Sequence, residues 1–325
     1  MRALAAPDKF RGTLTAAEAA EAMAQGARRA GWECTELPLA DGGEGTLDAL
    51  GGANRQTAVT GPLGEAVEAG WRLDGKLAVI EMARASGLAV AGGREVNDPL
   101  EASTYGTGEL IAAALREGAS RVIVCVGGSA TTDGGAGALA ALDGLVPFTG
   151  AAVSVACDVQ TGFLDAARVF GPQKGADAGQ IAELTARLAR HAQEYLERFG
   201  VDVKTIAGSG AAGGLAGGLA AAGARLMPGF ALVADLVGLD DALSQVDVVL
   251  TGEGHLDATS FQGKVVGGVC ERASARGVRA IAVAGRVDPD VAGRLPACSL
   301  VELFGEERAL ADTAVCVELA VAAAL

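Results

Sequence analysis

Short apolar runs alternate with helix-forming segments along most of the chain, and this alternation determines the class of fold that we expect. The runs RVIVCV (121–126) and VDVVL (246–250) have the length and composition of buried strands. Thr15 and Glu18 form a capping box that predicts the start of a helix, and an amphipathic segment predicts a long helix over 178–199. Strands that alternate with helices in this way predict an α/β protein with a mainly parallel sheet.

The chain is expected to contain two domains. Its 325 residues are more than one domain usually holds, and the segment 57–90 alternates like paired strands around the turn signals Gly61-Pro62 and Asp74-Gly75. No linker is evident, so we expect domains that interleave in the sequence. The rhythm of the elements predicts one domain from residues 1–55, 104–145 and 236–325, and a second from residues 56–103 and 146–235.

Charge and composition exclude several classes of protein. The 26 basic and 40 acidic residues give a net charge of −14, which argues against binding to nucleic acid or anionic membranes but permits binding of small phosphates. Two histidines are too few for a His-rich metal site, and the six cysteines form no CxxC pair. We see no secretory signal, and the Ala/Gly-rich stretch 205–224 is too weakly apolar for a membrane helix. We therefore expect a cytoplasmic protein.

Four loops share one design, in which a strand ends and small residues with an acidic residue follow. In open α/β sheets such loops gather at the carboxyl edge, where ligands bind. Their glycines allow backbone N–H groups to approach an anion, and carboxylates and cations around glycine loops suit phosphoryl transfer. One such loop alone is more often a simple turn, but four in one chain favour a ligand site. The loops span residues 6–12, 39–46, 127–135 and 251–257.

The chain lacks one familiar nucleotide-binding motif and contains a match to a second. The P-loop pattern GxxxxGK[ST] is absent, because Val265 follows Gly263-Lys264 and Ala258 stands at its first position. The segment 208–213 fits GxGxxG and is followed by Asp235, as in a dinucleotide fingerprint. The residues before it form a poor buried strand, so an NAD-dependent oxidoreductase that uses this loop is the alternative and not the main hypothesis.

The chain resembles the class I glycerate kinases nearly from end to end. The resemblance rests on nine blocks in order, among them PLADGGEGT, VGGSATTDGGAG and TGEGHLDATSFQGK. The blocks lie at residues 6–23, 38–46, 60–65, 80–88, 97–111, 126–137, 155–159 with 169–176, 208–219 and 251–264.

This resemblance implies ATP-dependent phosphorylation of D-glycerate to 2-phosphoglycerate, with ATP and Mg²⁺ as cofactors. It also implies a fold of two α/β domains, a flavodoxin-like, mainly parallel sheet and a smaller inserted α/β domain. The segment 208–219 then becomes a glycine loop of the family. The chain departs from the family pattern in a shortened segment at 138–152, so a non-catalytic nucleotide-binding relative remains an alternative. A homodimer also remains open.

Four acidic residues are expected to carry the chemistry. Asp41 is the first choice for the base that accepts the proton of the glycerate hydroxyl, because it follows a strand and two glycines come after it. Its alternative role is the N-cap of the next helix. Asp257 is the second choice, with an Asx turn as the alternative. Asp133 and Glu253 are expected to hold Mg²⁺, and His255 is given no catalytic role.

The remaining expected site residues bind substrate or phosphate. The guanidinium of Arg11 can bind a carboxylate or phosphate through two hydrogen bonds, and a loop of glycines and hydroxyls can cradle a phosphate. The residues expected to bind substrate are Asp8, Lys9, Arg11, Thr104 and Thr107. The residues expected to bind nucleotide or phosphate are Gly127, Gly128, Ser129, Thr131, Gly252, Gly254 and Lys264.

Overall fold

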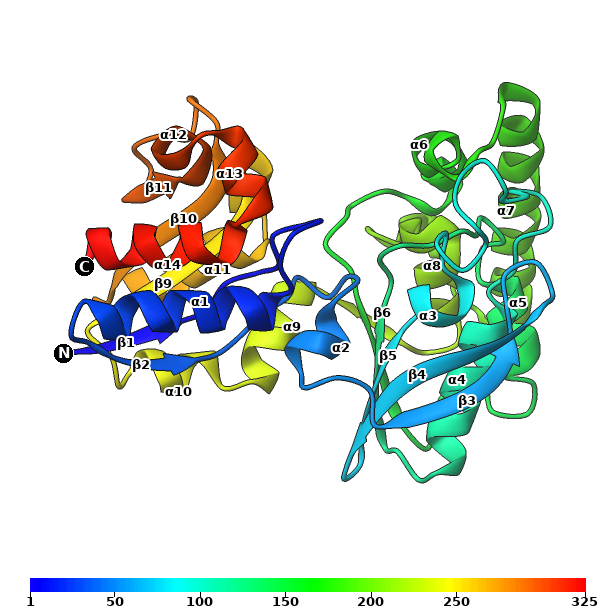
Figure 1. The fold of residues 1–325 in the computed structure, drawn as a ribbon. Helices are drawn as coiled ribbons and strands as arrows, with labels where there is room; N and C mark the ends of the chain where they lie inside the picture. The colour runs from blue at the N-terminus through cyan, green and yellow to red at the C-terminus, as the bar shows by residue number, and fades with distance from the viewer. The chain divides into compact units, whose positions relative to one another are not determined.

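A computed structural model describes residues 1–325, and its internal contacts divide the chain into two units (Figure 1). The first unit consists of Met1–Asp41, Asp48–Gly51 and Pro228–Leu325. The second unit consists of Gly42–Leu47 and Gly52–Met227. The chain therefore begins in the first unit, builds nearly all of the second, and returns to complete the first.

The first unit contains one five-stranded sheet in which every neighbouring pair of strands is parallel. Its strands are β1 (Arg2–Ala5), β2 (Glu33–Glu36), β9 (Val248–Leu256), β10 (Arg279–Val287) and β11 (Ala297–Ser299). The spatial order is β11-β10-β9-β1-β2. Numbered within the unit alone, this is the 2-1-3-4-5 order of flavodoxin-like sheets, so the expected fold of this domain is confirmed.

Helices cover both faces of this sheet because the apolar residues of its strands alternate in direction. Ala3, Val248 and Leu250 pack with α1 and α14 on one face, where Figure 1 shows these two helices side by side. Leu4 and Val249 pack with α9, α10 and α11 on the other face. The helices are α1 (Ala16–Arg29), α9 (Gly229–Leu236), α10 (Leu239–Leu243), α11 (Val265–Ser274), α12 (Leu300–Phe304), α13 (Glu306–Ala311) and α14 (Thr313–Ala324).

The contact between α1 and α14 depends on one glycine. Gly26 lies where the two helices approach, and a Cβ at this position would clash with the carbonyl of Glu318 and with Val321. The capping box of Thr15 and Glu18 starts α1 as predicted. Replacing Gly26 by a larger residue would force α14 away from the sheet.

The second unit contains a six-stranded mixed sheet of order β3-β4-β5-β6-β7-β8. An antiparallel hairpin, β3–β4, pairs with β5, and the strands from β5 to β8 are parallel. The strands are β3 (Arg55–Thr60), β4 (Ala66–Asp74), β5 (Leu77–Glu81), β6 (Arg121–Cys125), β7 (Ala152–Ala156) and β8 (Arg225–Met227). The helices are α3 (Ala83–Ser86), α4 (Tyr105–Arg116), α5 (Ala136–Ala141), α6 (Ala166–Phe170), α7 (Ala178–Phe199) and α8 (Leu215–Ala221), and α2 (Thr46–Ala49) spans a boundary between the units.

The two α/β domains are confirmed, but the predicted division of the chain between them differs from the structure. We expected residues 104–145 in the first domain, whereas their strand β6 pairs with β5 and β7 and lies inside the second sheet. We expected 228–235 in the second domain, whereas they form α9 of the first unit. The inserted unit is also the longer of the two, not the smaller. The rhythm of strands and helices does not reveal which sheet a strand joins.

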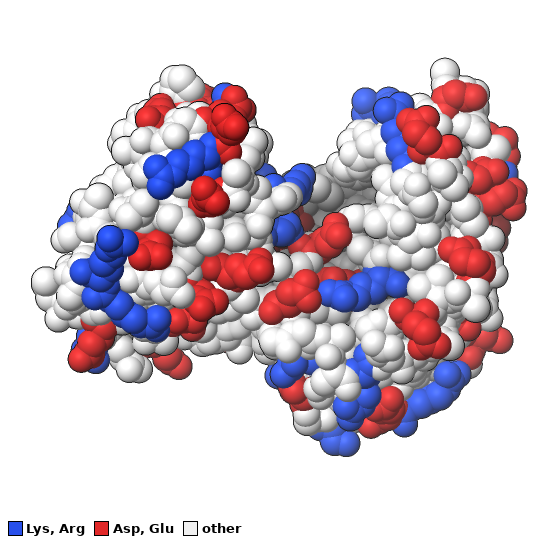
Figure 2. Space-filling view, viewed as in Figure 1, with Lys and Arg blue, Asp and Glu red and all other residues white.

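Charged side chains are distributed over both units. On the face shown in Figure 2, acidic and basic side chains lie intermingled between uncharged areas. No helix of the structure is both long enough and apolar enough to span a membrane.

Candidate active site

A pocket of about 360 Å³ lies in the first unit, at the carboxyl edge of its sheet. β1 and β9 are adjacent there, and the chain leaves them toward opposite sides of the sheet. This is the topological switch point, where open α/β sheets bind ligands. The pocket is lined by Asp8, Lys9, Arg11, Asp41, Glu253, Gly254, His255, Asp257 and Lys264. The structure therefore brings three of the four predicted loops together.

Backbone hydrogen bonds join these three loops. The amide of Asp8 donates to the carbonyl of Gly252 at 2.9 Å, and that of Leu39 donates to Pro7 at 2.9 Å. Gly252 is explained by packing, because a Cβ there would clash with the carbonyl of Val283, and it does not line the pocket. Gly254 does line it. Of the two glycines expected at the phosphate, the geometry therefore favours Gly254.

Among the acids of the pocket, Asp8 is buried and Glu253 is half-buried. Burial, followed by the charge of Asp41, raises the pKa of Asp8 to about 7, and the charge of Lys9 opposes this rise. One oxygen of Asp8 accepts a hydrogen bond from the amide of Lys9 at 2.7 Å. Burial also raises the pKa of Glu253, and its Oε1 atom is buried without a hydrogen-bond partner. Buried polar atoms are normally paired, so Glu253 has an oxygen available for a ligand.

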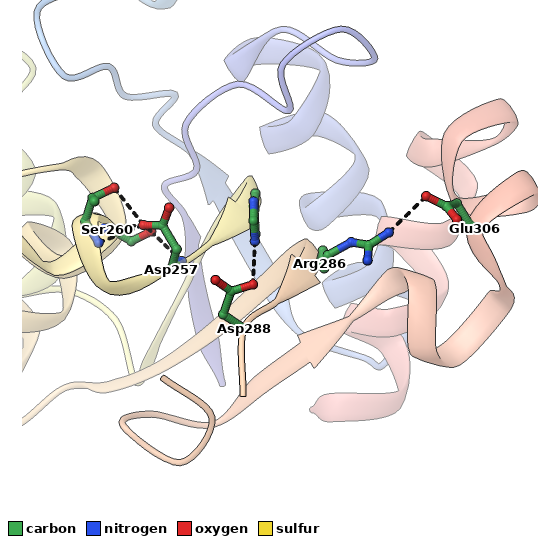
Figure 3. Close-up of polar contacts among 7 residues, drawn as sticks. Asp257, Ser260, Arg286, Asp288 and Glu306 are labelled. Atoms are coloured by element: carbon green, nitrogen blue, oxygen red, sulfur yellow. Dashed lines mark hydrogen bonds and ion pairs between the residues drawn. The ribbon is translucent and has the colours of Figure 1, made fainter. Parts of the chain in front are cut away.

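Asp257 is held by its own loop. Its Oδ1 accepts hydrogen bonds from the amides of Thr259 at 2.7 Å and Ser260 at 3.1 Å, which caps η5 (Ala258–Phe261) (Figure 3). The hydroxyl of Thr259 is the main reason that the pKa of Asp257 is lowered. Lys264 donates to the same hydroxyl at 2.9 Å. The geometry of Asp257 is that of the Asx turn, the alternative to its role as a base.

Polar residues from the ends of β9 and β10 continue the site beyond this pocket. His255, which sequence reasoning left without a role, lines the pocket, and its Nε2 lies 2.7 Å from Asp288. Arg286 donates to Glu306 of α13 at 2.9 Å (Figure 3). Arg286 and Glu306 line an adjoining cavity of about 170 Å³, which also includes Arg11, Gly254 and His255.

The other predicted site residues belong to the second unit. The loop of Gly127, Gly128, Ser129 and Thr131 follows β6, and both hydroxyl residues are buried. Thr107 donates to Ser86 at 2.9 Å within the core. This hydrogen bond holds the Thr107 side chain in the core, and its expected contact with substrate stays a prediction.

Asp133 has the contacts of a helix cap and not those of a metal ligand. It accepts hydrogen bonds from the amide and hydroxyl of Thr104, at 2.8 and 2.7 Å, and from the amides of Gly135 and Gly137, at 3.0 and 3.2 Å. These donors surround both carboxylate oxygens. These hydrogen bonds favour a structural role for Asp133 and Thr104, and the metal-binding and substrate-binding roles that we expected for them stay predictions. No cluster of three or more His, Cys, Asp or Glu side chains is arranged as a metal site.

The GxGxxG segment lacks the strand that a dinucleotide site requires. Residues 208–213 follow η3 (Val203–Thr205) and lead into η4 (Ala211–Gly214). A Cβ on Gly213 would clash with the carbonyl of Thr131, and the amide of Gly134 donates to Gly213 at 3.0 Å. The glycines therefore allow this segment to pack against the loop 127–135. This packing removes the basis for the oxidoreductase alternative.

Sequence reasoning missed three buried polar residues of the second unit. Glu81 accepts hydrogen bonds from the amides of Gly45 and Leu47, at 2.9 and 2.8 Å, and holds the segment 42–47. Asn97 and Lys174 hold the loop 127–131, as described below. Each lies in a block that also holds other charged or amide residues, such as Arg84, Asp98 and Gln173, so no signal in the sequence distinguishes it.

An open parallel sheet with acids and cations at its switch point is an arrangement at which α/β proteins bind small charged ligands. The family model described as the glycerate kinase family matches residues 3–147 and 144–318. The chain therefore belongs to the glycerate kinase family, and it is a kinase.

Individual relatives match the chain over most of its length. Glycerate 2-kinase of Escherichia coli K12 is 40% identical over 331 residues, covering 90% of this chain and 87% of that protein. Glycerate kinase of Halalkalibacterium halodurans is 41% identical over 320 residues, covering 86% and 84% of the two chains. A crystal structure of a protein provisionally named glycerate kinase 2, from Salmonella typhimurium LT2, aligns with a TM-score of 0.84 and 34% identity, covering 100% of this chain and 97% of that one.

Proposed function

We propose that this chain transfers the γ-phosphoryl group of ATP to D-glycerate in the presence of Mg²⁺ and releases 2-phosphoglycerate. The named relatives support glycerate as the acceptor. The observation that carries the proposal is the pocket of the first unit, where Asp8, Asp41 and Glu253 lie beside Lys9, Arg11 and Lys264. Phosphoryl transfer needs this combination, because a hydroxyl must lose a proton while phosphate charge is neutralised.

We propose Asp8 as the base, in place of Asp41. A general base works best when its pKa lies near the working pH, and the pKa of Asp8 is raised to about 7. Asp8 accepts the proton of the glycerate 2-hydroxyl while the oxygen of that hydroxyl forms a bond to the γ-phosphorus. The bond between the γ-phosphorus and the bridging oxygen breaks, and ADP leaves. Asp41 adds the negative charge that keeps the pKa of Asp8 high.

The three cations of the pocket neutralise the charges of both substrates. Arg11 can hold the glycerate carboxylate through two parallel hydrogen bonds, and Lys9 and Lys264 can contact phosphate oxygens. Gly254 allows a close approach, because an added Cβ would lie 3.2 Å from the amide nitrogen of Arg11. In the second unit, we propose that the loop from Gly127 to Thr131 binds an anionic group of a substrate.

The residues of the pocket fit a magnesium ion. Mg²⁺ in phosphoryl-transfer sites is bound by one or two carboxylates, phosphate oxygens and water. The Oε1 atom of Glu253 is buried and accepts no hydrogen bond, so Glu253 is the residue that would hold the ion. Bound there, Mg²⁺ would neutralise part of the phosphate charge during the transfer.

The test is ADP release from ATP, measured with and without D-glycerate, with L-glycerate and excess EDTA as controls. The phosphorus spectrum of the product identifies the position, because the phosphorus of 2-phosphoglycerate couples to one proton and that of 3-phosphoglycerate to two. We expect ADP release that requires D-glycerate and Mg²⁺, with a doublet in the spectrum. A triplet would contradict the position, and ATP binding without turnover would contradict the kinase activity proposed for this substrate.

A further inference from the structure

Lys174 is the one cation among the buried charged residues of the chain. It ends η2 (Pro172–Lys174), and its side chain is enclosed, with 2% of the residue exposed. No carboxylate lies within ion-pair distance of its Nζ, although Asp133 acts on it at longer range. Burial lowers the pKa of Lys174 to about 7. Burying an ammonium group without a carboxylate is costly, so this arrangement needs an explanation.

Both side-chain hydrogen bonds of Lys174 lead to the loop 127–131. Its Nζ donates to the carbonyl of Thr131 at 2.5 Å and to the hydroxyl of Ser129 at 3.4 Å. The side chain of Asn97 joins the two segments, because its Nδ2 donates to the backbone carbonyls of Ala130, at 3.1 Å, and Lys174, at 2.8 Å. Three separate sequence blocks therefore meet around one short loop.

The surroundings of Ser129 determine what its hydroxyl can do. The amide of Thr131 donates to Ser129 Oγ at 3.1 Å, and Lys174 Nζ is the second donor. A hydroxyl oxygen has two lone pairs and one hydrogen, so Ser129 is left with the role of a donor. Its acceptors in the structure are neutral oxygens at 3.0 to 3.5 Å, from Thr131 and Ala212. An anion would accept this hydrogen bond more strongly.

Exposure separates the roles of the two residues. Ser129 and Lys174 are both buried, but Ser129 keeps the larger exposed fraction, 8% against 2%. A neutral lysine amine keeps two hydrogens, one for the Ser129 hydroxyl and one for the Thr131 carbonyl. Both hydrogen bonds can therefore remain when Lys174 loses its charge. We propose that Lys174 is a positioning residue, which fixes the Ser129 hydroxyl as a donor to an anionic group, phosphoryl or carboxylate, of a substrate bound at the loop 127–131. This inference rests on the anion-binding role proposed for that loop.

The variants for the test are Lys174→Met, Ser129→Ala and the double variant, with Lys76→Met as a control at an exposed lysine of the same unit. Methionine replaces the buried amine by an apolar side chain of similar length, which removes the cost of burying the ammonium group but leaves the Thr131 carbonyl without this donor. Calorimetric titrations with ATP alone and with D-glycerate alone, followed by steady-state kinetics, show which substrate provides the anion.

We expect Lys174→Met and Ser129→Ala each to weaken one of the two affinities by about tenfold or more, the loss of one hydrogen bond to a charged group. The double variant should be no weaker than either single variant, because both changes remove the same donor. The KM of the same substrate should rise, while Lys76→Met leaves affinity and stability unchanged. A melting temperature of Lys174→Met at or above that of the wild type excludes a general loss of structure.

Two outcomes would overturn the inference. Independent effects that multiply in the double variant would mean that Lys174 does not act through Ser129, and unchanged affinities in Lys174→Met would remove it from the site. If Lys174→Met fails to fold, Ser129→Ala still tests whether the hydroxyl binds a substrate. If the wild type binds ATP without phosphorylating glycerate, while both variants lose ATP affinity together, the proposed function fails and this inference stands.

Discussion

Asp8 and Asp41 follow adjacent parallel strands and line the same pocket, and the charge of Asp41 adds to burial in raising the pKa of Asp8. The extended segments before them also pair, because the amide of Leu37 donates to Ala5 at 2.8 Å and that of Leu39 donates to Pro7 at 2.9 Å. The parallel register thus brings two like charges together. In such a pair, the negative charge of one acid raises the pKa of the other, which therefore keeps its proton to higher pH.

Asp8 should reduce the stability of the folded chain at neutral and higher pH. Its pKa rises from 3.8 to about 7 on folding, so between these values the folded chain holds a proton that the unfolded chain releases. The free energy of unfolding therefore falls as the pH rises through this window, by about 4 kcal/mol at most. Asp8→Asn should lose turnover but be more stable than the wild type at pH 8, with little difference at pH 4. Denaturant unfolding in EDTA at both values measures this, and equal stability at pH 8 would contradict it.

Asp41→Asn tests which of the two acids is the base. Without the charge of Asp41, the pKa of Asp8 should fall, and the acid limb of the pH profile of kcat/KM should move to lower pH. Turnover should be reduced but measurable, with ATP affinity retained. Complete loss of turnover in Asp41→Asn, together with substantial activity in Asp8→Asn, would make Asp41 the base.

Arg11→Ala should chiefly raise the KM for glycerate. The loss of a two-hydrogen-bond contact with a carboxylate corresponds to a change of about tenfold to a hundredfold. Arg279→Ala is the matched control, because Arg279 is exposed at the amino end of β10, away from the pocket residues. Kinetics of Arg11→Ala that match those of the control would remove Arg11 from the site.

Glu253 and Asp133 should respond differently to removal of their charge. Glu253→Gln should increase the Mg²⁺ concentration needed for half-maximal activity, because its buried oxygen is the proposed ligand. Asp133→Asn should leave that concentration unchanged and lower the free energy of unfolding by about 1–3 kcal/mol, since it weakens the hydrogen bonds of a helix cap. Titration of activity with Mg²⁺ and chemical unfolding distinguish the two variants, and the reverse pattern would restore Asp133 as the metal ligand.

The features that the sequence predicts best are those with local causes. The capping box at Thr15 and the helix over Ala178–Phe199 have the predicted bounds, because capping and amphipathic periodicity act over a few residues. The convergence of three acidic loops was predictable from the parallel sheet alone. The membership of β6 was not, because apolar strands of similar composition can pair in either sheet.

The sequence does not reveal which charged side chains of the site are buried, and only the structure shows this. Lys174 follows Gln173 in an ordinary polar stretch, and only its packing against Ser129 and Thr131 distinguishes it from a surface lysine. Asp133 is the opposite case. Its position in an acid-bearing glycine loop predicts that it binds a metal ion, whereas its contacts in the structure are those of a helix cap. The same residue types serve both purposes, and tertiary contacts decide between them.

The long interruption of the first unit determines the order in which the chain can fold during synthesis. β1 lies between β2 and β9, but β9 begins at Val248, after the whole of the second unit. At 5–20 residues per second, translation from β2 to β9 lasts on the order of 10–40 s. During this time the second unit emerges with all six strands of its sheet, whereas β1 has an unpaired edge. The nascent chain therefore exposes an edge of the strand that leads to Asp8 until its C-terminal quarter is made, and an unpaired strand edge is prone to aggregation.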